Sequence, residues 1–243
     1  KNLNQIQLSC LTVAVRFLPK LNSTRRTILL STWGLFTGLA LLLLTAGVYS
    51  TLVGIRAELK NLPTLISGGI TTAYYAGFLL GSWYTLRALK QVGHIRVYAA
   101  LASLLSASVL IIGAYDSPIV WIVMRSSTGF CFAGLYVVAE SWLNGLASNT
   151  FRGRLLAMYN VVTIGAYGAG QLLVFNFDAR TLTGFAFAAV ISSLAVIPVA
   201  MSEQAATPTV ENNTHITMRE LAKIVPTGAG TILLVGLAHG GML

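Results

Sequence analysis

Long runs of apolar residues, separated by short polar stretches, make up most of the chain. A helix needs about 20 mostly apolar residues to cross the hydrocarbon core of a bilayer. The pattern predicts six such helices and the start of a seventh near residue 225, which is cut short at Leu243. The six predicted spans are residues 29–54, 63–86, 97–115, 118–144, 155–177 and 181–201.

The length and continuity of these runs favour membrane helices over two other arrangements. Strands of a membrane barrel alternate in polarity over about 10 residues. Buried helices of a large soluble protein would be amphipathic and carry many surface charges. The chain is 55% hydrophobic and 9% charged, whereas soluble domains are about 25% charged. We therefore predict an all-α, polytopic membrane helix bundle.

The basic residues are distributed unevenly between the two sides of this predicted topology. A net charge of +9 could suit a nucleic-acid partner, but twelve cations precede the first span or occupy alternate connections, and three occupy the opposite connections. The twelve are Lys1, Arg16, Lys20, Arg25, Arg26, Arg87, Lys90, Arg96, Arg152, Arg154, Arg219 and Lys223, and the three are Arg56, Lys60 and Arg180. Cytoplasmic loops carry such an excess, so we expect a cytoplasmic amino terminus, a cytoplasmic (inner) membrane location, the lipid bilayer as partner and no nucleic acid.

The same pattern divides the chain into four segments. They are a cytoplasmic extension (1–26), a six-helix bundle (27–201), a central cytoplasmic loop (202–224) and the start of the truncated seventh helix (225–243). The chain has no initial Met and ends within an apolar run, so we expect a fragment or a processed product.

An eight-residue phrase occurs twice, as AYYAGFLL from Ala73 and as AYGAGQLL from Ala166. The copies lie in the second and fifth predicted spans, which run in opposite directions. This placement is typical of a 3+3 inverted repeat in secondary transporters, although Ala, Gly and Leu are common enough here for coincidence. Ala73 with Gly77, and Ala166 with Gly170, place small side chains on one helix face, where another backbone can approach closely. Ordinary packing in a static bundle is the alternative reading.

Arg125 is the one charge placed deep within a predicted span. A cation there is costly and should face a partner or a cavity. Glu140 lies about 22 Å further along the same helix, and Asp116 lies in a connecting loop. Carbonyls of a neighbouring helix, an anionic substrate and a group in a missing half of the protein are the other candidates. We predict that Arg125 binds substrate or couples transport, with a structural role as the alternative.

Glu140 is predicted near the cytoplasmic ends of the helices, with Arg87, Arg96, Arg152 and Arg154 on the same side. A salt-bridge latch that opens and closes is one reading. A surface ion pair worth under about 1 kcal/mol is the other.

The spans contain no paired acids, no Ser with a base and no His cluster, so the sequence predicts no catalytic residues, no metal site and no cofactor. We therefore do not expect an enzyme.

RSSTGFCFAG, from Arg125 to Gly134, resembles the span-four signature of the major facilitator superfamily of transporters, with Arg125, Gly129 and Ala133 matching. FRGRLLAMYN, from Phe151, is similar to the family's entry to span five. The resemblance covers about residues 27–201 and fits its amino-terminal half, in a divergent bacterial-type branch.

The stretch GSWYTLRALKQVGHIRVY resembles the family's basic signature between spans two and three, with Gly81, Gly93 and Arg96 in place. Its spacing is longer, and Lys90 stands where the family has an acid. With Glu140, Arg152 and Arg154, these residues are our candidates for a cytoplasmic gate.

The resemblance implies a permease that moves a small solute by alternating access, with ion coupling, protons above all, and a carboxy-terminal half that this chain lacks. It further implies that spans two and five face that half. With Arg125 as the only deep charge, we favour an anionic or neutral polar solute. A non-transporting membrane scaffold or assembly subunit that binds partner helices is the alternative.

Overall fold

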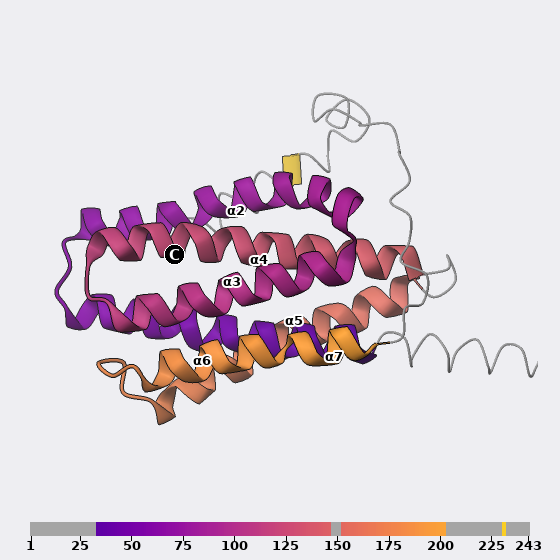
Figure 1. The fold of residues 1–243 in the computed structure, drawn as a ribbon. Helices are drawn as coiled ribbons and strands as arrows, with labels where there is room; N and C mark the ends of the chain where they lie inside the picture. Colours follow the sequence, from indigo (N-terminus) through magenta and orange to yellow (C-terminus); the bar gives the residue numbers. More distant parts are fainter. Residues whose placement is uncertain (1–32, 147–151, 203–229, 232–243) are drawn as a thin grey trace, which may run out of the picture. The chain divides into compact units, whose positions relative to one another are not determined.

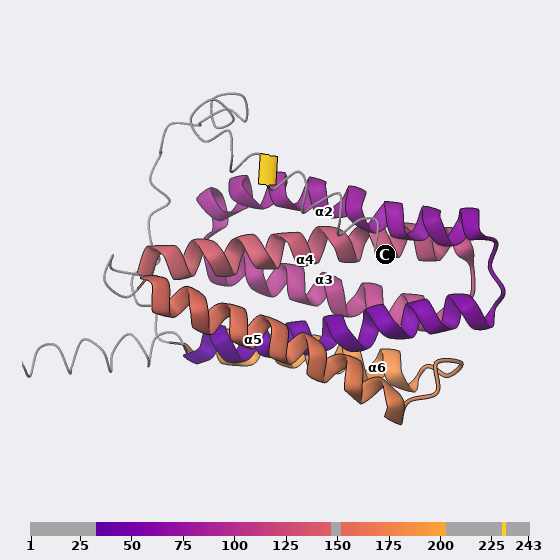
Figure 2. The ribbon, with the colours of Figure 1, turned by 180° about the vertical axis from the view of Figure 1, so that it is seen from behind.

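The computed structural model describes residues 33–146, 152–202 and 230–231. The helices are a first helix (Trp33–Leu59), α2 (Thr64–Val92), α3 (His94–Ala114), α4 (Pro118–Leu146), α5 (Arg152–Leu173), the short 3-10 helix η1 (Val174–Asn176), α6 (Thr183–Leu194) and α7 (Val196–Met201). Successive long helices run antiparallel to one another, whereas η1 continues α5 and α7 continues α6 in the same direction (Figures 1 and 2). The predicted extension 1–26 and central loop 202–224 lie outside the described residues, except for Ser202. The predicted seventh helix also lies outside them, except for Gly230 and Thr231, which are helical.

Each of the six predicted spans corresponds to a helix or a pair of helices, so the all-helical fold is confirmed. Within the described residues, four segments are long and apolar enough to cross a membrane: Trp33–Leu59, His94–Ala114, Pro118–Gly145 and Thr183–Met201. The helices α2 and α5 have 29 and 22 residues, or about 43 and 33 Å at 1.5 Å per residue, but they are more polar. Six crossings therefore remain a prediction.

Glycine and proline set several of the helix ends. Gly93 adopts a φ of 88° between α2 and α3, a left-handed conformation that glycine adopts readily. Pro118 begins α4, where its missing N–H is not needed. The helix α6 ends at Leu194 because Pro198 cannot donate to the Leu194 carbonyl and its ring would crowd that group.

The first helix and α4 provide much of the buried core. Tyr49 and Leu52 on the first helix, and Trp121 and Trp142 on α4, are at most 1% exposed. The helix α4 packs against α2 and α3, and α3 also packs against α6. These contacts place the middle of α4 deep inside the bundle.

The helices α2 and α4 come into backbone contact through two glycines. A Cβ atom added to Gly77 would collide with the backbone carbonyl of Ser126, and one added to Gly129 would collide with the carbonyl of Tyr74. Small residues allow this approach, which is the main source of attraction between helices in lipid.

The first helix and α5 make a contact of the same form. A Cβ atom on Gly170 would collide with the carbonyl of Leu44, and one on Gly47 would collide with the carbonyl of Tyr167. The two helices of the repeated phrase thus use the same positions: the second residue supplies the carbonyl and the fifth is the glycine. On each partner helix the carbonyl precedes the glycine by three residues.

A charged cluster closes the end of the bundle where the first helix meets the α3–α4 connection. Arg56 and Lys60 each lie 3.0 Å from a carboxylate oxygen of Asp116. Arg56 also donates a 2.9 Å hydrogen bond to the Gly113 carbonyl, and its Cζ lies 5.2 Å from the centre of the Phe185 ring. Only 8% of the Arg56 side chain is exposed, so this cation depends on its protein partners.

Gly77→Ala should lower the free energy of unfolding by about 1–3 kcal/mol, because the added methyl group forces α2 away from the Ser126 carbonyl. Gly170→Ala should cause a loss of the same size through Leu44. Gly68→Ala is the matched control, because nothing lies within 4 Å of a Cβ atom there. Unfolding of the purified protein in mixed micelles, followed by circular dichroism, measures these changes. Equal stability of Gly77→Ala and Gly68→Ala would contradict the close contact.

Asp116→Asn should lower the free energy of unfolding by about 1–3 kcal/mol, because Arg56 is then left buried beside a weaker acceptor. Lys60→Gln should change it by under about 1 kcal/mol, because that pair is solvated. The same unfolding experiment compares them. If Lys60→Gln lowered the free energy of unfolding as much as Asp116→Asn does, burial of Arg56 would not be the deciding factor.

Candidate functional site

The middle of α4 carries Arg125 into a group of tyrosines from three other helices. Its Cζ lies 5.1 Å from the ring centre of Tyr49 on the first helix and 4.9 Å from that of Tyr74 on α2. Tyr167 on α5 is close enough to interact electrostatically with the guanidinium. We call Arg125, Tyr49, Tyr74 and Tyr167 the Arg125 cluster.

Hydrogen bonds hold two of these rings in place. Tyr49 is 1% exposed, and its hydroxyl shares a 3.1 Å hydrogen bond with the Thr128 hydroxyl. The guanidinium of Arg125 lies over the Tyr49 ring, with its Cζ 5.1 Å from the ring centre. The hydroxyl of Tyr167 shares a 3.0 Å hydrogen bond with Ser50. These bonds fix the Tyr49 and Tyr167 rings relative to the first helix and α4.

The charge of Arg125 is not matched by a carboxylate in the described part of the chain. Its Nε is buried and has no hydrogen-bond partner there, and the groups that interact with it electrostatically are tyrosines. Both acids considered from the sequence are engaged elsewhere. Asp116 pairs with Arg56 and Lys60, and Glu140 accepts a 3.2 Å hydrogen bond from the Tyr159 hydroxyl. The π faces of tyrosines stabilise a desolvated cation by about 2 kcal/mol or more, but they supply no negative charge.

The repeated phrase contributes to the cluster twice. Tyr74 and Tyr167 occupy its second position in the two copies. Each is three residues from the glycine that brings its helix against α4 or the first helix. The phrase therefore sets both the spacing of the helices and the tyrosines beside Arg125.

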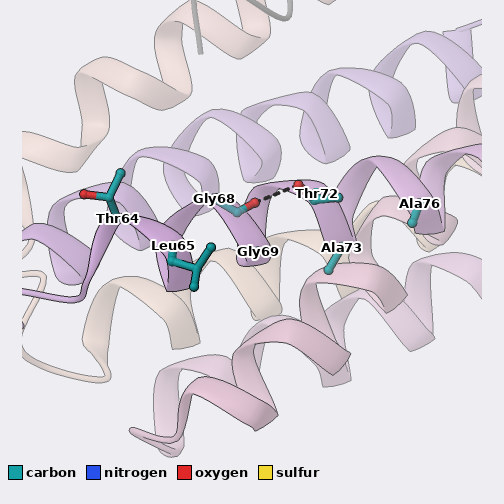
Figure 3. Close-up of a pocket in the computed structure, with 7 residues that line it drawn as sticks. All are labelled: Thr64, Leu65, Gly68, Gly69, Thr72, Ala73 and Ala76. Carbon is teal, nitrogen blue, oxygen red and sulfur yellow. Dashed lines mark hydrogen bonds between the residues drawn. The ribbon is translucent and has the colours of Figure 1, made fainter.

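A shallow, open groove of about 760 Å³ follows the small-residue face of α2. Gly68, Gly69, Thr72, Ala73 and Ala76 line it, and Thr72 bonds back to the Gly68 carbonyl at 2.8 Å (Figure 3). Ala73 thus borders an open groove while Gly77, one turn on, lies against α4. On α5, Ala166 packs on the core, and Gly168 has nothing near its Cβ position.

The predicted gate residues lie at two depths. Arg96, Glu140, Arg152 and Arg154 are exposed near the helix ends. Glu140 makes no ion pair with these arginines in the part of the chain that the structure describes. Gly93 forms the turn between α2 and α3. Gly81 lies deeper, where a Cβ atom would collide with the Phe130 backbone of α4.

The sequence reasoning identified Arg125 but missed the tyrosines around it. The sequence does contain a signal for two of them, because both copies of the phrase have Tyr as their second residue. The sequence analysis considered only the Gly and Ala of the phrase. It also missed the Arg56–Asp116–Lys60 cluster: Arg56 and Lys60 served only to assign the topology, and Asp116 was considered only as a partner of Arg125. Among the described residues, no three His, Cys, Asp or Glu side chains are grouped as metal ligands would be.

No protein-family model and no solved structure matches the chain. Curated relatives do match. YcaD of Salmonella typhimurium (strain LT2), an uncharacterized MFS-type transporter, is 33% identical over 148 residues, which are 61% of this chain and 39% of the relative. Ent638_1421 of Enterobacter sp. (strain 638), also an uncharacterized MFS-type transporter, is 31% identical over 166 residues, covering 66% of this chain and 44% of the relative.

The chain thus spans less than half the length of the curated relatives that it matches. The similarity covers about two thirds of the chain and accompanies an all-helical architecture with four apolar helices able to cross a membrane. The chain is therefore related to the MFS-type transporters, the major facilitator superfamily.

Proposed function

We propose that the chain is the amino-terminal half of a secondary active transporter that moves a small solute by alternating access. The observation that carries this proposal is the Arg125 cluster, a cation among tyrosines that no carboxylate of the described residues compensates, in the middle of helices related to those of transporters. Such polar groups within a membrane are costly and are kept for function. The carboxy-terminal half of the transporter would correspond to the part of the relatives' sequences that this chain does not match.

The six helices would form a 3+3 inverted repeat. The contact of α2 with α4 and that of α5 with the first helix use equivalent positions of the repeated phrase, as an inverted repeat requires. The helices α2 and α5 are more polar than the four segments that are apolar enough to cross a membrane. This polarity suits helices that line a solute path and face a second half of the protein. The open small-residue groove on α2 supports the same placement.

The cationic end of the bundle would lie on the cytoplasmic side of the inner membrane of a bacterial cell. Arg87, Lys90, Arg96, Arg152 and Arg154 are at the end formed by the α2–α3 turn, the end of α4 and the start of α5. Cytoplasmic loops favour such cations. We place the cytoplasmic gate there, with Gly81, Gly93, Arg96, Glu140, Arg152 and Arg154 as its parts.

An ion gradient, of protons above all, would drive the solute. The titratable groups of this chain that could couple transport to protons are Glu140 and His239. Glu140 accepts a hydrogen bond from Tyr159, which links α4 to α5, and His239 lies outside the described residues. The Arg125 cluster would then contact the solute.

A second candidate is a non-transporting scaffold or assembly subunit. The open small-residue groove on α2 favours it, since such faces also bind partner helices. Concentrative uptake separates the two. The full-length protein in proteoliposomes should accumulate a solute when an inward proton gradient is applied and should stop when the gradient is dissipated. Stable capture of a membrane protein without uptake of any solute would favour the scaffold.

Single cysteines test the topology in a variant that lacks Cys10 and Cys131. Cysteines placed at Lys90 and at Arg152 should both react with an impermeant maleimide from the cytoplasmic side, because both turns would lie on that side. A cysteine at Asp178 should react from the opposite side. Labelling of the first two positions from opposite sides would overturn the six-crossing arrangement.

A further inference from the structure

We infer that the Arg125 cluster is the binding site for the negative charge of the solute, and that this solute is a monoanionic organic acid. The inference rests on the proposed function and narrows it to a class of substrate. It is drawn from the charge balance of the cluster, the number of its cations and the hydrogen bonds of its three tyrosine hydroxyls.

The charge balance calls for an anion. The guanidinium is always protonated, its Nε is buried without an acceptor, and no carboxylate of the described residues interacts with it. The tyrosine rings lie against the cation, but within the described residues they leave its charge uncompensated. A bound carboxylate would supply both the missing acceptor and the missing charge.

The number of cations sets the charge of the ligand. No second cation of the described residues belongs to the cluster, because the groups that interact with Arg125 are tyrosines. One guanidinium fork matches one carboxylate in a bidentate pair. A dicarboxylate or a doubly charged phosphate would carry one charge without a partner in a low-dielectric site, so the cluster should select against both.

Tyr74 is the tyrosine of the cluster whose hydroxyl makes no hydrogen bond within the described residues. Tyr49 is fully buried and bonded to Thr128, and Tyr167 is bonded to Ser50. Tyr74 is only partly buried, and within the described residues it makes ring contacts without a hydrogen bond from its hydroxyl. Its hydroxyl is therefore free to donate to the second side of a carboxylate held by Arg125.

The test measures binding to the purified full-length protein by thermal stabilisation. The probes are small monocarboxylic acids, aliphatic and aromatic, each with its neutral amide and its amine, together with succinate and inorganic phosphate. Monocarboxylates should raise the melting temperature in a saturable way, and their amides and amines should not. Succinate and phosphate should bind at least about tenfold more weakly, since each leaves a charge unpaired.

Four variants connect this binding to the cluster. Arg125→Gln should abolish carboxylate binding, and Arg125→Lys should weaken it about tenfold because a point charge replaces the fork. Tyr74→Phe should weaken it a few-fold through the lost hydroxyl. Tyr75→Phe is the matched control: its ring contacts Tyr74 but not Arg125, and it should bind as the wild type does. If Arg125→Gln fails to fold, Arg125→Lys and Tyr74→Phe decide the matter.

The inference is overturned if amides stabilise the protein as well as acids do, if no monocarboxylate binds, or if Arg125→Lys and Tyr74→Phe bind like the wild type. Uptake in proteoliposomes separates this outcome from failure of the proposed function. Uptake of a neutral or cationic solute that is unchanged in Arg125→Lys would leave a transporter without an anion site. Carboxylate binding that requires Arg125 but leads to no uptake would leave an anion site without a transporter.

Discussion

Close backbone contact between helices is the constraint on which the rest of this structure depends. In lipid, apolar side chains gain little free energy when they leave the acyl chains for a helix contact, because the acyl chains are equally apolar. Helices therefore associate through tight packing and hydrogen bonds. Gly77 and Gly129 allow α2 to touch α4, and Gly47 and Gly170 allow the first helix to touch α5. A methyl group at any of these four positions would separate backbones that are in direct contact.

The same contacts create the charged site. Tyr74 and Tyr167 supply the carbonyls that the glycines approach; the Tyr74 ring lies beside Arg125, and Tyr167 is close enough to interact with it electrostatically. Separation of either helix pair would therefore move a tyrosine away from the cation. Because a charge within the membrane costs about 2.5–3.5 kcal/mol even by the lower scales, the tyrosines contribute to stability as well as to recognition. Packing and chemistry are in this way linked through the second and fifth residues of one short phrase.

Much of the fold could be predicted from the sequence because the bilayer imposes simple rules. Continuous apolar runs gave all six helical regions, and residues such as Gly93 and Pro118 ended or began helices where turns were expected. The break between α6 and α7 was missed, because Pro198 acts on a carbonyl four residues earlier inside an apolar run. The polarity of α2 and α5 was also passed over, since apolar length alone had identified them.

The site could be predicted only in part. Arg125 was evident because a charge in an apolar run is conspicuous in one dimension. Its neighbours come from three other helices, and their distances to the guanidinium depend on crossings that no local pattern encodes. Tyr49 illustrates this: nothing in its own helix distinguishes it from an interfacial tyrosine, yet it is fully buried against Thr128.

The two charged sites of the bundle differ in a way that bears on their roles. Arg56 has its carboxylate partner in Asp116, a carbonyl in Gly113 and a ring in Phe185, so its interactions are complete within the described residues. Arg125 has the rings of Tyr49 and Tyr74 but no carboxylate in that part of the chain, and its Nε has no partner there. A cation with complete partners stabilises the fold, whereas one lacking an anion stabilises it less than it could. The incomplete site is therefore the one at which an incoming solute gains the most by binding.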